Sequence, residues 1–327
     1  MFCIQNTKNL AVTLSLFFVI HFVTGQDTKN RIFTASEISL QTATGNIYGT
    51  LTVPNRETTC SVVLIIAGSG PTDRDGNNTF GLKTDTYKQL AECLAKKGIA
   101  SLRYDKRGIA ASKEAMKSEK ELIFENYIED AKAWISLLKS DNRFSKIIIL
   151  GHSEGSLIGM VAAQQTVVDQ FISIAGIGRP ADKVLQEQLK GKLLSKLEEE
   201  SNQILDSLLK GFLVTSVSKE LYSLYRPSVQ PYMISWLKYD PAVEITKLTI
   251  PVLIIQGTTD IQVSVNDAQL LSAAKPDAER IIIKNMNHVL KKSSSDLNEN
   301  MATYAKPELP LMKGLMKNII SFLRNHI

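Results

Sequence analysis

The chain has 327 residues, of which 44% are hydrophobic and 22% are charged, and its formal net charge at pH 7 is +5. This composition is typical of a folded globular protein, and the length is sufficient for one large domain with an insertion. The positive charge is small and no block of Lys and Arg stands out, so nothing favours a nucleic-acid-binding protein.

The N-terminus has the layout of a signal peptide. Residues 1–9 contain Lys8 and no acid, residues 10–23 are almost wholly apolar, and small residues follow as far as Gly25. An apolar run of about 14 residues is short for a membrane span. We therefore expect residues 1–25 to be removed from a secreted or periplasmic protein that has no stable membrane insertion, with an uncleaved N-terminal anchor as the alternative.

Strand and helix patterns alternate through the first half of the chain. Residues 31–59 alternate in polarity around Thr44-Gly45-Asn46 and predict an antiparallel hairpin. Buried strands are then expected at residues 61–67, 99–104, 147–150 and 171–175, and amphipathic helices at residues 85–97 and 124–139. This alternation predicts an α/β fold with a mostly parallel, doubly wound sheet.

The alternation stops at residues 181–240, which are polar with Leu at helical spacings. We interpret this segment as a helical cap inserted over the carboxyl edge of the sheet, with its charges facing solvent. The sheet is expected to resume with strands at residues 250–255 and 280–283, and helices at residues 266–274 and 311–326. The expected organisation is a core of residues 26–180 and 241–327 interrupted by this cap.

The sequence Gly151-His152-Ser153-Glu154-Gly155 joins the strand at residues 147–150 to a helical pattern of small residues. A sharp turn from strand to helix strains its central residue and brings the two elements so close that the flanking positions should be glycine. Ser153 would then stand at the carboxyl end of the sheet and at a helix N-terminus, which favours a developing negative charge. This is the nucleophile-elbow pattern, G-x-S-x-G between strand and helix.

A serine nucleophile needs a base, and the chain has four histidines. His21 lies in the predicted signal peptide, His152 lies within the elbow and should point into the fold, and His326 lies at the end of the last helix. His288 alone follows a strand at the edge where Ser153 should emerge. It is therefore the predicted base.

Three aspartates compete for the role of the acid that orients this base. Asp260 ends a strand at the same edge, whereas Asp240 precedes Pro241 and suits a turn or helix start. Asp105 is flanked by basic residues, which indicates a structural ion-pair loop. The resulting chain order, Ser153, Asp260, His288, is the order expected of one particular fold.

These motifs together resemble those of the α/β-hydrolases, and more narrowly of secreted bacterial esterase-like members related to the serine aminopeptidase family. The matching segments extend from about residue 60 to the C-terminus and comprise Gly68-Ser69-Gly70-Pro71-Thr72-Asp73-Arg74-Asp75-Gly76, Arg103-Tyr104-Asp105-Lys106-Arg107-Gly108, Gly151-His152-Ser153-Glu154-Gly155, Gly257-Thr258-Thr259-Asp260 and Asn287-His288. One departure is Ala110, which stands where the family usually has the second glycine of Arg-Gly-x-Gly-x-Ser.

The resemblance implies a serine hydrolase that cleaves small carboxylic esters through an acyl-enzyme. Ser153 would be the nucleophile, His288 the base and Asp260 its orienting carboxylate, with the backbone N–H groups of Ser69 and Glu154 as oxyanion donors. Neither a cofactor nor a metal is expected; Asp73-x-Asp75-x-Asn77 resembles the start of a calcium loop, but the glycine and the closing Glu are not in place.

Two alternatives remain open from the sequence. An aminopeptidase or amidase could use the same triad, with a cap carboxylate to bind the free amino group; the candidates are Glu187, Glu198, Glu199 and Glu200. A non-catalytic hydrolase-fold binding protein is the second alternative, although it would need no serine–histidine pair. The sequence leaves the oligomeric state undetermined, as well as whether Cys60 and Cys93 form a disulfide.

Overall fold

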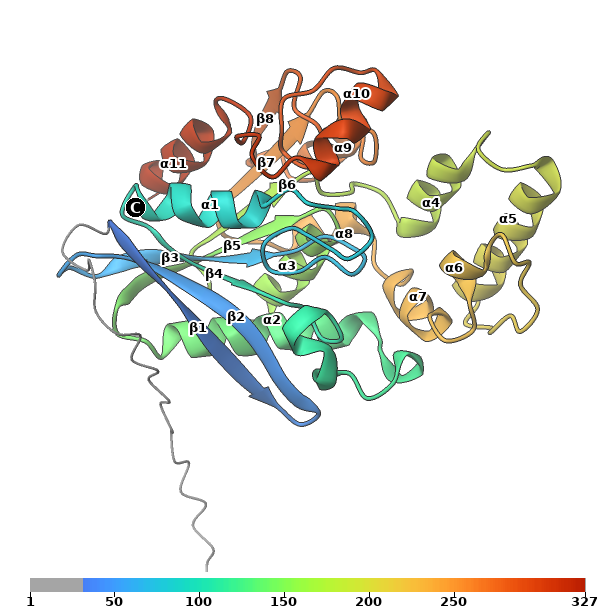
Figure 1. Cartoon of the computed structure of the whole chain (residues 1–327), viewed down its shortest axis with the longest axis horizontal. Helices are drawn as coiled ribbons and strands as arrows, with labels where there is room; N and C mark the ends of the chain where they lie inside the picture. Colours follow the sequence, from blue (N-terminus) through green and yellow to red (C-terminus); the bar gives the residue numbers. More distant parts are fainter. Residues whose placement is uncertain (1–31, 327) are drawn as a thin grey trace, which may run out of the picture. The chain divides into compact units, whose positions relative to one another are not determined.

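A computed structural model describes residues 32–326 and shows one eight-stranded sheet in the order β1-β2-β4-β3-β5-β6-β7-β8 (Figure 1). The strands are β1 (Phe33–Thr42), β2 (Gly45–Pro54), β3 (Cys60–Ile66), β4 (Ala100–Tyr104), β5 (Phe144–His152), β6 (Gln170–Ile174), β7 (Val252–Gly257) and β8 (Glu279–Ile283). From β4 to β8 the neighbouring strands are parallel, as predicted from the alternation of strand and helix patterns.

The antiparallel part of the sheet is the predicted hairpin. β1 pairs with β2 from Phe33 opposite Pro54 to Thr42 opposite Gly45, and β2 pairs antiparallel with β4. One face of this hairpin is largely open to solvent, which explains why its residues alternate in polarity. The strands that follow, such as β3 and β5, carry continuous apolar runs because helices cover both of their faces.

Helices cover the sheet on both faces, so the prediction of a doubly wound sheet is confirmed. Their bounds are α1 (Thr86–Ala95), α2 (Phe124–Lys139), α3 (Glu154–Gln164), α8 (Pro241–Thr246), α9 (Val265–Ala274) and α11 (Leu315–Asn325). One hydrophobic core joins the sheet to α2, α3, α8 and α9. A second core joins the other face to α1 and α11.

Between β6 and β7 the chain forms further helices, as predicted for residues 181–240. They are α4 (Ala181–Leu189), α5 (Ser195–Leu209), α6 (Tyr222–Tyr225) and α7 (Gln230–Trp236). We call this segment the helical insertion; it lies beside the carboxyl ends of the strands (Figure 1). A hydrophobic cluster around Leu205, Tyr225 and Met233 holds it together. Its status as a separate cap domain stays a prediction.

Two expectations about the C-terminal part were wrong in detail. Between residues 283 and 311, where the sequence predicts neither helix nor strand, the chain contains α10 (Leu297–Ala302), whose first turn is capped by the side chain of Asp296. Six residues are too few to show a helical period in the sequence. The last helix begins at Leu315 rather than at residue 311, because Gly314 has a φ of 92° and interrupts the helical backbone.

The predicted signal peptide at residues 1–25 lies outside the described residues. Within residues 32–326, every helix is too short or too polar to cross a bilayer.

Candidate active site

Ser153 occupies a strained turn between β5 and α3. Its φ and ψ are 54° and −123°, a conformation that residues with a side chain rarely adopt. A Cβ on Gly151 would lie 2.3 Å from Gly155 O, and a Cβ on Gly155 would lie 2.3 Å from Ile66 O. Both glycines are therefore required by the close approach of helix and strand, which confirms the physical reason for the elbow pattern.

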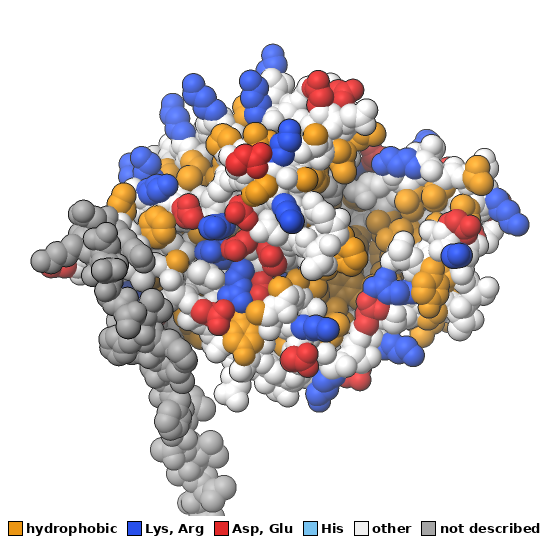
Figure 2. Space-filling model, viewed as in Figure 1, with side chains coloured by type: hydrophobic (Ala, Val, Ile, Leu, Met, Phe, Trp, Pro, Cys, Tyr) orange, Lys and Arg blue, Asp and Glu red, His pale blue; other side chains and the backbone are white. Residues whose placement is uncertain are grey.

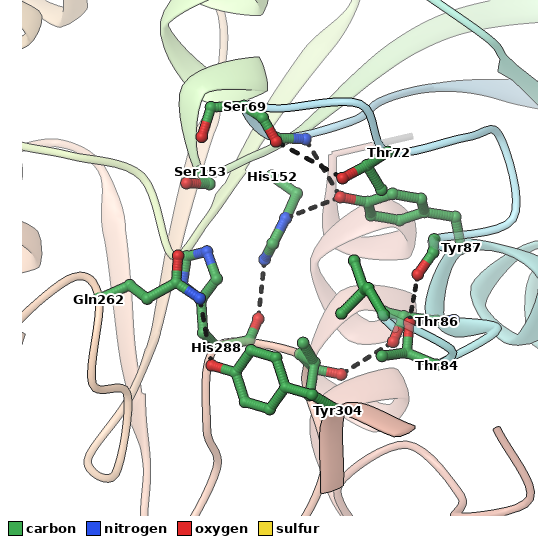
Figure 3. Close-up of a pocket in the computed structure, with 14 residues that line it drawn as sticks. Ser69, Thr72, Thr84, Thr86, Tyr87, His152, Ser153, Gln262, His288 and Tyr304 are labelled. Atoms are coloured by element: carbon green, nitrogen blue, oxygen red, sulfur yellow. Dashed lines mark hydrogen bonds between the residues drawn. The ribbon is translucent and has the colours of Figure 1, made fainter. Parts of the chain in front are cut away.

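The turn presents Ser153 to a small cavity at the carboxyl edge of the sheet. The Ser153 N–H donates to Ile174 O at 3.0 Å, which ties the turn to β6. Ser153, Ser69 and His288 all line the cavity, whose volume is about 90 Å³ (Figure 3). Only 8% of Ser153 is exposed. The serine is thus accessible from this cavity and otherwise surrounded by protein.

Asp260 and His288 meet directly, although they follow different strands. Asp260 comes after β7 and His288 after β8, and His288 Nδ1 lies 2.8 Å from Asp260 Oδ2. The other carboxylate oxygen of Asp260 accepts the N–H groups of Gln262 and Val263. Burial raises the pKa of Asp260, but His288 and these N–H donors outweigh it and the net pKa is lowered. An ionised Asp260 places the proton of His288 on Nδ1 and leaves Nε2 as a base.

The hydrogen bonds among the described residues do not include one from Ser153 Oγ to His288. The two side chains share the lining of the cavity, and catalytic hydrogen bonds are often long before substrate binds. The structure therefore brings Asp260 and His288 into contact, and brings His288 and Ser153 to the same cavity.

His152 is buried, as expected, and forms a directed chain of hydrogen bonds along the wall of the cavity (Figure 3). His152 Nε2 lies 2.9 Å from His288 O, a carbonyl that can only accept, so Nε2 carries the proton. Nδ1 must then accept the hydroxyl proton of Tyr87 at 2.9 Å, and the Tyr87 oxygen accepts the Gly68 N–H at 3.1 Å.

The loop after β3 lies directly against the elbow. A Cβ on Gly68 would lie 3.1 Å from Ser153 Cβ, so only glycine allows this approach without displacing the serine. Within residues 32–326, the backbone N–H groups of Ser69 and Glu154 have no hydrogen-bond acceptor. Two free donors flank Ser153, one on the Gly68 loop and one at the start of α3.

The competing candidates have structural roles. Asp240 caps the N-terminus of α8 by accepting the Ala242 N–H. Asp105 is buried in an ion pair, as expected, but its partner is Arg74 from the loop after β3 rather than a neighbour in the chain. His326 lies beside Glu279, at the opposite edge of the sheet from the cavity. Cys60 and Cys93 are both free thiols.

The cap carboxylates considered for binding an amino group lie outside the cavity lining and contact other residues. Glu187 pairs with Arg179, and Glu200 accepts both the N–H and the hydroxyl of Ser218. The aspartates of the calcium-like loop are likewise occupied. Asp73 accepts the N–H groups of Asp75 and Asn77, and Asp75 pairs with Arg103.

Sequence reasoning missed three residues close to the elbow. Tyr87 falls within the helix predicted at residues 85–97, and Lys106 within the ion-pair loop predicted around Asp105, and neither was assigned a part in the site. Lys106 Nζ donates to Gly68 O at 2.7 Å and to Glu154 Oε2 at 2.9 Å. Tyr232, from α7 of the insertion, donates to Glu154 Oε1 at 2.6 Å. No local pattern indicates these contacts, because the partners are far apart in the sequence.

Comparison with known proteins identifies relatives in sequence and in structure. A curated relative, the esterase EstD of Thermotoga maritima, is 30% identical over 251 residues, which is 74% of this chain and 57% of that protein. The chain therefore spans little more than half of this relative's length. Among solved structures, Est1E from Butyrivibrio proteoclasticus with ferulic acid bound has a TM-score of 0.59 at 17% identity and covers 88% of this chain and 99% of its own.

A Pyrococcus furiosus esterase has a TM-score of 0.56 at 15% identity, covering 93% of this chain and 95% of its own. At such low identities these structures establish the fold, which is that of the α/β-hydrolases. Residues 80–292, about two thirds of the chain, match the family described as serine aminopeptidase, S33. The chain belongs to this serine aminopeptidase-like family of α/β-hydrolases.

Proposed function

We propose that this protein is a serine hydrolase that cleaves carboxylic esters with Ser153, His288 and Asp260. The observation that carries the proposal is the convergence of a strained elbow serine and a histidine–aspartate pair on one cavity. Relatives named as esterases add support, among them EstD, which is 30% identical to this chain over 251 residues.

The mechanism follows from the proton positions. Ser153 Oγ attacks the carbonyl carbon of the ester and gives its proton to His288 Nε2, while Asp260 stabilises the resulting imidazolium through Nδ1. The carbonyl electrons move to the oxygen, which accepts the N–H groups of Ser69 and Glu154. When the tetrahedral intermediate collapses, the C–O bond breaks and the alkoxide takes the proton from His288. Water repeats the sequence on the acyl-enzyme and releases the acid.

The surroundings of Ser153 limit the substrate. The cavity of about 90 Å³ is well below the size of pockets that bury drug-sized ligands. We therefore expect the part of the ester that enters this cavity to be short. The visible face is hollowed between the core and the helical insertion, and hydrophobic side chains gather along this hollow (Figure 2). We expect the longer part of the substrate to lie in this hollow.

We also propose that the enzyme acts outside the cytoplasm, because residues 1–25 have the layout of a signal peptide.

The direct test is the variant Ser153→Ala. It should abolish labelling by a fluorophosphonate probe and lower kcat by roughly a thousandfold or more, because the nucleophile is lost. Ser156→Ala is the matched control, since Ser156 is a buried serine of α3 that bonds to Ser173 and does not line the cavity. Retained turnover in Ser153→Ala would remove this residue from the mechanism.

The substrate class is tested separately. A screen of p-nitrophenyl esters of graded acyl length beside aminoacyl-naphthylamides should show turnover of short esters. Turnover of the naphthylamides alone would indicate that the protein is an aminopeptidase with the same triad and not an esterase.

A further inference from the structure

Lys106 lies after β4 in the interior beside the elbow, and the mechanism above gives it no part. Its side chain is 2% exposed and that of its partner Glu154 is 4% exposed. Lys106 Nζ also donates to Gly68 O at 2.7 Å and lies 4.8 Å from the centre of the Tyr127 ring. A buried ion pair costs desolvation and contributes little net stability, so stability alone does not explain why the charge is here.

The contact with Gly68 O fixes the direction of the next N–H. A peptide group is planar and trans, so the carbonyl of Gly68 and the N–H of Ser69 belong to one rigid unit and point in opposite directions. Because the Gly68 carbonyl points toward the ammonium group of Lys106, the N–H of Ser69 points away from Lys106. The preceding peptide is held as well, because the Gly68 N–H donates to Tyr87.

The charge of Lys106 also acts on the strength of this donor. A cation at the carbonyl oxygen polarises the peptide and makes its N–H a stronger donor, and burial increases the effect. Ser69 N–H has no acceptor among the described residues, so the polarised donor is available to a ligand.

The second free donor is tied to the same lysine. Glu154 follows Ser153, and its carboxylate accepts Lys106 Nζ at 2.9 Å on one oxygen and Tyr232 OH at 2.6 Å on the other. Lys106 thus connects the loop that carries Ser69 to the helix start that carries the N–H of Glu154.

We propose that Lys106 is a positioning residue that aligns the two oxyanion donors, Ser69 N–H and Glu154 N–H, and polarises the first of them. This inference rests on the proposed function, in which those two groups bind the oxyanion.

The experiment separates this role from simple ion pairing. Lys106→Met leaves Glu154 as an unpaired buried carboxylate and should lower both Tm and kcat/KM. The double variant with Glu154→Gln removes both buried charges while the oxygen of the new amide can still accept from Tyr232, so its Tm should rise above that of Lys106→Met. In the double variant Gly68 O still lacks its lysine, so kcat/KM should stay about tenfold to a hundredfold below that of Glu154→Gln. This loss is smaller than the loss seen when an oxyanion donor is removed altogether.

A second readout reports the oxyanion donors directly. An aryl trifluoromethyl ketone forms a tetrahedral oxyanion adduct with a catalytic serine, and its affinity should fall by the same factor as kcat/KM. All rates are referred to active sites titrated to completion with a fluorophosphonate. Lys275→Met is the control, because Lys275 is also a buried lysine paired with a carboxylate, that of the exposed Asp277, but follows the last turn of α9 before β8, away from the cavity.

A double variant with the kcat/KM of Glu154→Gln would overturn the proposal, and so would an unchanged affinity for the ketone. Failure of the proposed function looks different: the unmodified protein would then hydrolyse no ester, or Ser153→Ala would remain active.

Discussion

His152 is held in one protonation state by its neighbours. Burial, and then the nearby His288, lower the pKa of His152 from its usual 6.5 to about 3. The folded protein therefore keeps this imidazole neutral, with Nε2–H on His288 O and Nδ1 on the Tyr87 hydroxyl. Burial has the opposite effect on Tyr87: it raises the pKa of the phenol, so the hydroxyl keeps the proton that it donates to His152.

A pH dependence of stability follows from this shift. Below pH 6.5 the unfolded chain takes up a proton at His152 that the folded protein does not, so the free energy of unfolding falls as the pH falls. Between pH 6.5 and pH 4 this one group should account for roughly 3 kcal/mol.

The measurement compares urea unfolding of the unmodified protein and His152→Gln at several pH values. The difference in unfolding free energy between them should shrink as the pH falls to 4, because other titrating groups are common to both proteins. A difference that is constant with pH would contradict the assigned protonation state.

At the scale of elements, the segment after β4 carries backbone strain at Ala110, the residue that departs from the family pattern. Ala110 starts the short helix η1 (Ala110–Ala115) with a φ of 44°, in the left-handed region that glycine adopts freely. The family resemblance placed a glycine at this position, and the backbone has kept the conformation that glycine would favour.

Ala110→Gly should therefore raise the free energy of unfolding by about 0.5–1 kcal/mol, since relief of the left-handed strain outweighs the added freedom of the unfolded chain. Ala110 is exposed, so no packing is lost. Ala111→Gly is the control; Ala111 is also exposed but has a negative φ, and the same change should destabilise. Equal effects of the two substitutions in urea unfolding would refute the strain argument.

At the scale of the whole described fold, the helical insertion and the core meet in an aromatic cluster. Phe124, at the start of α2, packs within 6.4 Å, centre to centre, of the rings of Tyr232, Trp236 and Tyr239. An ion pair between Arg226 and Glu119 joins the two parts a second time. Because Tyr232 also bonds to Glu154, this packing connects the position of the insertion to the elbow.

Phe124→Ala should lower the free energy of unfolding by about 3–5 kcal/mol and also reduce kcat per titrated active site several-fold, because α7 loses the surface that positions Tyr232. Phe322→Ala, an equally buried phenylalanine of α11 on the opposite face, should lose stability while kcat of the folded protein is unchanged. Equal kcat values for the two variants would show that the packing of the insertion on Phe124 does not affect catalysis.

The alternation of buried strands and amphipathic helices was sufficient to predict the doubly wound sheet, because the hydrophobic period of each strand and helix is carried by its own residues. The elbow and the candidate partners were also within reach of the sequence. Gly151 and Gly155 are imposed by backbone contact, and only one histidine follows a strand at the edge where Ser153 emerges. Helix α10 escaped prediction because one and a half turns leave no period to detect.

The sequence by itself determined the strands, the longer helices and the side chains expected at the carboxyl edge of the sheet. Only the tertiary structure decided what holds them there: Lys106 on Gly68 and Glu154, and Tyr87 between Gly68 and His152. These contacts join residues 19 to 65 positions apart. Periodicity reports which face of an element is buried, whereas the partner of a buried polar group depends on how distant elements pack against one another.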